Sequence, residues 1–204
     1  YLANTTEAGE RLLPYSTVAA FDPVPGMPAL ELEDGTAAPV LAAGEILLNQ
    51  WAAADLGVAP GDEIALSYFV VGRRGKLSTQ RAFFRLRGVV ALRGLGADPG
   101  LTPVFPGMQE ADDMAAWEAP FPVDLALIGP RDEAYWDQFE AAPKGFVALA
   151  TGQRLWRSRF GQTTALRFGP APGQDARQAS IRFGAQVLQK ISPPQVGLAF
   201  QPVR

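Results

Sequence analysis

This chain of 204 residues contains no histidine and no cysteine, two side chains that carry much of protein catalysis and metal binding. A Ser-His-Asp triad, an imidazole or thiolate metal site and a cysteine nucleophile are therefore excluded. Enzyme chemistry would have to use carboxylates, lysine or a bound cofactor. No such set stands out, so we predict no catalytic, cofactor-binding or metal-binding residues and no cofactor.

The carboxylates nearest to an acid–base pair or a cation site are Asp132, Glu133 and Asp137. A helix is expected over residues 132–142, and acidic side chains in its first turn stabilise the positive end of the helix dipole. The adjacent acids at 112–113 have the same interpretation. A structural role is therefore the prediction for all of them.

Three arginines, Arg154, Arg157 and Arg159, surround Trp156. Stacking on the indole ring and binding of a phosphate or lipid headgroup are both open to such a cluster. The favoured interpretation is that these arginines pair with acidic residues of the same domain. The basic strand around residues 81–87 is not expected to bind nucleic acid, because the sequence pI is about 5.1.

Charge is segregated along the chain, although the net charge is only −3. Residues 1–63 carry ten acids and one base, 64–97 seven bases and no acid, 98–143 ten acids and one base, and 144–190 eight bases and one acid. Blocks of opposite sign either pair across the fold or make opposite faces. We expect pairing within the fold.

The hydrophobic pattern predicts strands alternating with short helices, which indicates an α+β fold: a mixed β-sheet with short helices packed on it, in one body or two lobes. Asn49 is expected to cap a helix that Gly57 closes, and Gly61 and Asp62 are expected to form a turn. Strands are expected at 18–21, 45–49, 64–71, 81–92, 163–168 and 197–203, and a short strand or turn at 146–150. Helices are expected at 49–56, 110–117, 132–142, 151–160 and 174–191.

The strands at 64–71 and 81–92 are expected to form a hairpin. Side chains alternate along a strand, so Ala82, Phe84 and Leu86 should face the core, while Arg81, Phe83, Arg85 and Arg87 face outward. A long proline-rich loop is expected over 94–130, where aromatic residues indicate packing or the docking of a partner.

The unit at 46–64, a strand, short helix, Gly-Asp turn and strand, resembles one in the periplasmic domains of FtsX-like and MacB-like permeases. A similar pattern occurs in the double-psi barrels of molybdopterin enzymes. Segments at 2–4, 14–20, 49–62, 68–72, 101–107, 117–125, 132–136 and 143–161 follow in order. Together they resemble the extracytoplasmic loop of a bacterial FtsX-like ABC transporter permease.

The resemblance implies one non-catalytic extracytoplasmic domain over 1–204, held between the first two membrane helices of a permease at the periplasmic face of the bacterial inner membrane. Its implied partners are those membrane helices, a cytoplasmic ABC ATPase and a second permease copy, with a periplasmic protein, lipid or lipoprotein as substrate or partner, and no nucleic acid. Tyr1 resembles a mid-domain position, so earlier strands are expected to precede it. A strand near Val18 or Phe200 should then lack a neighbour and expose an edge.

Two alternatives stay open. A soluble cofactor- or ligand-binding barrel-like domain of an enzyme would use the Gly61-Asp62 turn and should have a deep apolar pocket. A pure interaction domain would dock a periplasmic protein through the loop at 94–130.

Overall fold

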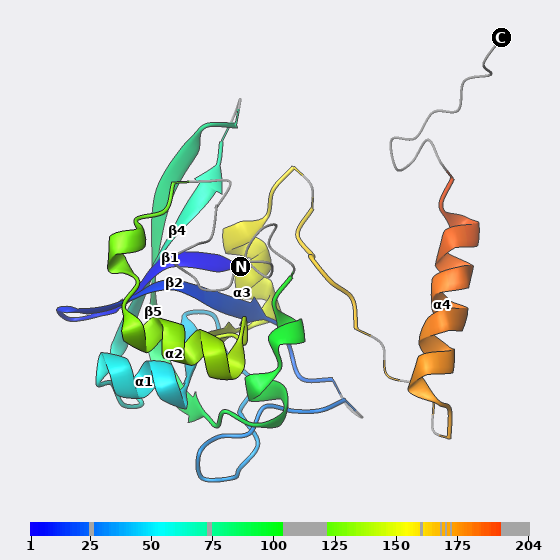
Figure 1. Ribbon diagram of the computed structural model, residues 1–204, viewed down its shortest axis with the longest axis horizontal. Helices are drawn as coiled ribbons and strands as arrows, with labels where there is room; N and C mark the ends of the chain where they lie inside the picture. Colours follow the sequence, from blue (N-terminus) through cyan, green and yellow to red (C-terminus); the bar gives the residue numbers. More distant parts are fainter. Residues whose placement is uncertain are drawn as a thin grey trace. The chain divides into compact units, whose positions relative to one another are not determined.

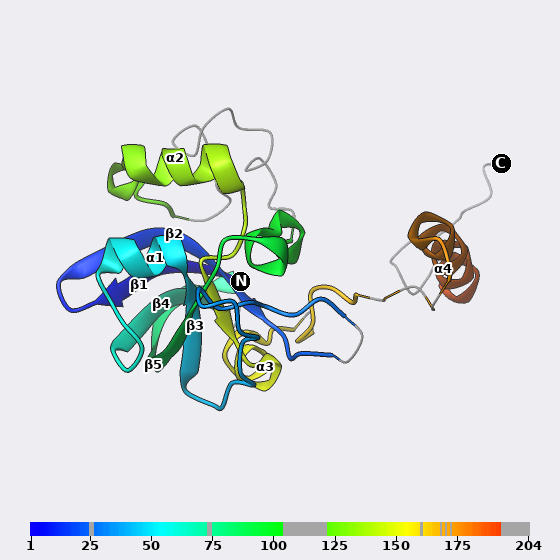
Figure 2. The same cartoon turned by 90° about the horizontal axis from the view of Figure 1, so that it is seen from below.

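The computed structural model describes residues 1–24, 27–72, 75–103, 122–159, 161–167, 169, 171 and 173–192. Contacts within the chain divide it into two compact units, Tyr1–Ala165 and Leu166–Arg204, and each is described by itself. The first unit is built around a closed β-barrel (Figures 1 and 2).

The barrel has six strands in the order β1-β2-β6-β3-β5-β4, and β4 pairs with β1 to close it. The β2–β6 and β3–β5 pairs are parallel, and the other pairs are antiparallel. The strands are β1 (Leu2–Ala8), β2 (Arg11–Ala20), β3 (Glu45–Asn49), β4 (Glu63–Val71), β5 (Leu77–Val90) and β6 (Gly145–Val147). The predicted α+β sheet with helices packed on it, in one body or two lobes, is therefore wrong: the sheet closes on itself.

The closing strand β1 is the element that the hydrophobic pattern did not predict. Its middle is polar, with Asn4, Thr5, Thr6 and Glu7 in succession, and no local rule marks such a segment as a strand. It is held by pairing with β2 on one side and β4 on the other. The strand that contains Val18 is itself paired on both sides, with β1 and β6, so the exposed edge expected there is wrong.

The described residues of this unit form three α-helices: α1 (Gln50–Leu56), α2 (Pro130–Phe139) and α3 (Leu149–Trp156). Figure 2 shows α1 and α2 together on one side of the barrel, with α3 on another. As predicted, Asn49 caps α1 by accepting from the Ala52 amide (2.8 Å), and Gly57 ends it with a φ of 66°. The helix α2 ends earlier than predicted, where Glu140 takes a φ of 51°.

The loop predicted at 94–130 contains short 3₁₀ turns where the structure describes it, at Gly94–Ala97, Pro99–Leu101 and Leu125–Leu127. Residues 163–167 lie in no strand, so the strand expected at 163–168 is wrong over these residues. The helix expected at 110–117 and the strand expected at 197–203, including Phe200, lie outside the described residues.

The β4–β5 hairpin is confirmed, and it has the predicted alternation. Phe84 is 4% exposed inside the barrel, whereas Phe83 is 55% exposed outside it. The barrel core contains Leu13, Val18, Ile46, Leu48, Ile64, Leu66, Phe84 and Leu86.

The predicted pairing of charge blocks is confirmed between residues 1–63 and 64–97. Ion pairs join Arg81 to Glu7, Arg87 to Glu45 (3.7 Å) and Arg93 to Glu31 (2.7 Å). These arginines are about half exposed, and exposed pairs of this kind stabilise a fold by at most about 1 kcal/mol each.

The second unit contains α4 (Ala176–Lys190), which confirms the helix predicted at 174–191. Asp175 caps it by accepting from the Gln178 amide at 2.8 Å. No residue of α4 is buried. Among the described residues, no helix combines the length and apolar character needed to cross a membrane.

A first prediction concerns the packing of α3 against β2. A Cβ added at Gly152 would lie 2.3 Å from the Ala20 Cβ and 3.1 Å from the Trp156 ring. Alanine normally favours a helix over glycine by about 1 kcal/mol, but the Ala20 Cβ cannot rotate away. We therefore expect Gly152→Ala to lower the free energy of unfolding by about 1–3 kcal/mol in urea denaturation.

The matched control is Gly184 in α4, where the same added Cβ would have no atom within 4 Å. Gly184→Ala should raise helicity in circular dichroism. A Gly152→Ala protein more stable than the native protein would contradict the close approach of α3 to β2.

Candidate functional site

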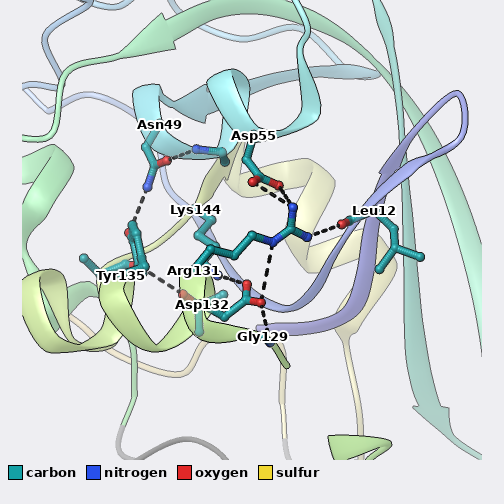
Figure 3. Close-up of polar contacts among 11 residues, drawn as sticks. Leu12, Asn49, Asp55, Gly129, Arg131, Asp132, Tyr135 and Lys144 are labelled. Atoms are coloured by element: carbon teal, nitrogen blue, oxygen red, sulfur yellow. Dashed lines mark hydrogen bonds and ion pairs between the residues drawn. The ribbon is translucent and has the colours of Figure 1, made fainter. Parts of the chain in front are cut away.

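The most unusual side chain of the first unit is Lys144, which is only 6% exposed. Its backbone immediately precedes β6 and is fixed on two sides. The Lys144 amide donates to the Thr17 carbonyl (2.9 Å), and the Lys144 carbonyl accepts from the Asn49 amide (3.0 Å). These bonds hold the residue between β2 and β3, beside the two helices shown with it in Figure 3.

The Lys144 ammonium lies among three groups from α1 and α2. Its Nζ is 4.5 Å from the centre of the Trp51 ring, 4.8 Å from that of the Tyr135 ring and 3.7 Å from Asp132 Oδ1. At 3.7 Å the carboxylate forms an ion pair without a hydrogen bond. Burial lowers the pKa of Lys144 to about 8, and the charge of Asp132 offsets part of that shift.

Asp132 has two roles in this cluster. Its Oδ2 accepts a hydrogen bond from the Gly129 amide at 3.0 Å, which satisfies a free donor at the start of α2. Its Oδ1 faces Lys144, and the side chain is only 2% exposed. The predicted structural role of an acid in the first helical turn is confirmed for Asp132.

Arg131 fastens the start of α2 to α1 and to β2. Its guanidinium contacts the Asp55 carboxylate at 2.7 Å and donates to the Leu12 carbonyl at 3.1 Å. The guanidinium Nε also lies 3.8 Å from Asp132 Oδ2. The charges of Arg131, Asp55, Asp132 and Lys144 thus form one connected set of alternating sign (Figure 3).

A neutral bridge lies on the other side of Lys144. Asn49 Nδ2 donates to the Tyr135 hydroxyl (2.8 Å) and to the Pro143 carbonyl (3.1 Å) while its Oδ1 caps α1. The Tyr135 hydroxyl donates in turn to the Ala142 carbonyl at 3.0 Å. Burial raises the pKa of Tyr135, so this phenol stays protonated across the physiological range.

We name Asn49, Trp51, Asp55, Arg131, Asp132, Tyr135 and Lys144 the lysine cluster. An amine with a pKa near 8 has a reactivity that suits covalent catalysis. Its surroundings suit a structural role better, because Lys144 is enclosed by two rings and a carboxylate and is almost inaccessible. The cluster joins α1, α2 and β6, and its geometry supports this structural role.

Asp137 and Asp62 are not part of this cluster. Asp137 is exposed on α2, and the acids at 112–113 lie outside the described residues. Asp62 accepts from the Ala59 amide at 2.8 Å beside Gly61, whose φ is 105°, so the predicted turn is confirmed. Among the described residues, no three or more Asp or Glu side chains are placed to hold a metal ion.

The arginine segment at 154–159 meets aromatic rings at Trp156. The indole stacks on Tyr1, with ring centres 4.9 Å apart and planes at 7°, and the Tyr68 ring is nearly perpendicular to it, with centres 6.3 Å apart. Four of the ten acids in the 98–143 block lie within 104–121, outside the described residues. Pairing of these arginines with that block stays a prediction.

Lys144 is the residue that the sequence reasoning missed. Its partner Asn49 is far away along the chain, and its partner Tyr135 lies on α2, so no local motif links them to Lys144. One signal was present: Lys144 is the only polar side chain in the run from Ala141 to Ala150. A lone cation within such an apolar run is a candidate for burial with a partner.

Two open depressions mark the barrel surface among the described residues. The first lies beside the Gly61 turn and is lined by Gly44, Gly61, Glu63, Phe83, Phe84 and Arg85. The second lies beside α1 and is lined by residues that include Arg11, Gly57 and Asp62. Neither depression reaches Lys144.

No protein-family model matches this chain, and no curated protein matches it.

A second prediction separates the lysine cluster from an ordinary surface ion pair. Lys144→Met leaves the Asp132 carboxylate buried and poorly paired, so we expect a loss of about 3–5 kcal/mol in the free energy of unfolding. Lys144→Met/Asp132→Asn removes both charges and keeps an acceptor for the Gly129 amide. We expect this double variant to recover most of the loss in denaturant unfolding.

The control is Arg93→Met, which removes the exposed pair with Glu31 and should cost less than about 1 kcal/mol. A double variant as unstable as Lys144→Met alone would show that the two charges do not depend on each other.

A third prediction concerns pH. The pKa of Lys144 is about 8 in the fold against an ordinary value of 10.5, so between these values the unfolded chain binds more protons than the folded one. The contribution of Lys144 to stability therefore rises with pH through this window. Relative to Lys144→Met/Asp132→Asn, the native protein should gain up to about 3 kcal/mol of unfolding free energy between pH 8 and 10.5. A flat or falling difference in denaturation at constant ionic strength would contradict the burial of the ammonium.

Proposed function

We propose that this chain is the non-catalytic extracytoplasmic domain of a FtsX-like, MacB-like ABC transporter permease. In this role it couples ATP-driven movement of membrane helices to the export of a substrate or to a periplasmic partner. The domain lies on the periplasmic face of the bacterial inner membrane. Its contacts are the permease's own membrane helices, a second permease copy and, through the full-length protein, a cytoplasmic ABC ATPase.

The observation that carries the proposal is the convergence of three resembling segments. The segment at 49–62 supplies Asn49 and Asp55, the segment at 132–136 supplies Asp132 and Tyr135, and the segment at 143–161 supplies Lys144. They meet in the lysine cluster, although Asn49 and Pro143 are 94 residues apart. Segments whose order resembles a family thus also share one structural task.

The kind of task favours transmission of movement over chemistry. A closed barrel with a packed core resists deformation and moves as one body. The lysine cluster attaches α1 and α2 to that body through ion pairs among its own residues. A domain of this build is suited to relay a displacement from a membrane helix to whatever binds its outer surface.

A fourth prediction tests the proposal in the full reading frame and in cells. We expect an apolar segment of about 20 residues before the region that encodes 1–204, and further ones after it. In spheroplasts that express the full-length protein, added protease should cleave the domain, and an ABC ATPase should co-purify with the solubilised protein. A reading frame without membrane segments, or a domain protected from external protease, would overturn the proposal.

A second candidate is favoured by the barrel itself. The closed barrel and the Gly61-Asp62 turn also fit a cofactor- or ligand-binding domain of a soluble enzyme, with the depression near Phe83 and Arg85 as its binding surface. That depression is open and is not the deep apolar pocket expected of such a domain. Such a domain would gain thermal stability with a nucleotide or pterin at saturation, and Arg85→Ala would remove the gain. The same screen should leave a permease domain unchanged.

A further inference from the structure

The helix α4 has an apolar face whose side chains are partly or largely exposed. Ile181 is 63% exposed and Leu188 is 75% exposed, and Val187 is only partly covered. A helix that buries none of its apolar residues contributes little to a core. The described residues of its own unit do not bury this face, so an apolar surface outside them would be needed to cover it.

The face is broad. With about 100° of rotation per residue, Phe183, Val187 and Ile191 follow one line, while Ile181 and Leu188 follow a second. Small residues at 180 and 184 separate the two lines. A helix that inserts into a protein groove usually presents one line of anchors at i, i+3, i+4 and i+7. Two lines of apolar side chains spread over a wide arc are better suited to a broad, deformable surface than to a narrow protein groove.

The charge of α4 has one sign. Residues 176–190 contain Arg177, Arg182 and Lys190 and no acidic residue. The neighbouring Asp175 is occupied as the helix cap. Arg182 lies on the side opposite the apolar face, and Lys190 lies at the edge of that face, seven residues after Phe183. Arg177 lies at the N-terminal end of the face, where a long side chain can reach past apolar neighbours. An apolar face combined with only basic charges is the pattern of helices that lie on anionic membranes.

We propose that α4 lies on an anionic lipid surface, with Ile181, Val187 and Leu188 at the boundary between headgroups and acyl chains and with its basic residues at the headgroups. Apolar burial and attraction to anionic lipid then act together. The inference goes beyond the proposed function and does not depend on it, since any anionic bilayer supplies the surface.

The absence of cysteine makes the test direct, because a single introduced thiol is the only labelling site. The full chain is prepared as Leu188→Cys, on the apolar face, and as Gln186→Cys, on the polar face, each with an environment-sensitive fluorophore. Each protein is mixed with phosphatidylcholine vesicles, with or without one third phosphatidylglycerol. We expect a blue shift and a several-fold rise in emission at position 188 with phosphatidylglycerol, a much smaller change at 186, and weakening of both effects at high salt.

Matched variants test the contribution of charge. Arg182→Gln/Lys190→Gln should weaken binding to anionic vesicles about tenfold or more, as the loss of two basic contacts predicts. Arg87→Gln/Arg93→Gln, which removes the same charge from the barrel, should leave vesicle binding unchanged. Circular dichroism checks that each variant is folded.

Several results would overturn the proposal. These are no response to anionic vesicles, an equal and salt-independent response to neutral vesicles, and an equal response at 186 and 188. A probe at 188 that is already in an apolar environment without vesicles would assign the face to the chain itself or, if light scattering shows a dimer, to a second copy. Each of these outcomes is independent of the reading-frame test of the permease.

Discussion

A positive charge buried beneath two aromatic rings constrains this barrel more than any other single interaction. At 6% exposure the Lys144 ammonium has little water to solvate it, so its balancing charge must come from the protein. That charge is Asp132, and the rings are Trp51 and Tyr135. Because these partners come from α1 and α2, displacement of either helix separates Lys144 from a ring or from the carboxylate that it contacts.

Lys144 also stabilises β6, the shortest of the described strands. The strand β6 has only three residues and lies between β2 and β3, where it completes the ring. Lys144 ties its start to both neighbours through backbone hydrogen bonds and to the helices through its side chain. The same residue therefore holds β6 in the barrel and attaches the two helices to it.

Local rules predicted the elements whose causes are local. The cap at Asn49, the stop at Gly57, the turn at Asp62 and the alternation along β5 each depend on neighbours a few residues apart. Barrel closure was not predicted, because it depends on β1 pairing with β4 some 60 residues away and β1 has no distinctive pattern. Closure is a property of the whole sheet, and alternating strands and helices are compatible with open and closed arrangements alike.

For the site, the sequence predicted that Asp132 stabilises a helix start, and it left Lys144 unnoticed. Asp132 was accessible to reasoning because its partner, the Gly129 amide, is three residues away. Lys144 meets Trp51 across 93 residues, and only the apolar run around it hinted at burial.

The most direct test of this account is native-state hydrogen exchange measured against denaturant. It predicts that amides of α1, α2 and β6 open together with one free energy, whereas independent opening of α2 at lower denaturant would contradict it.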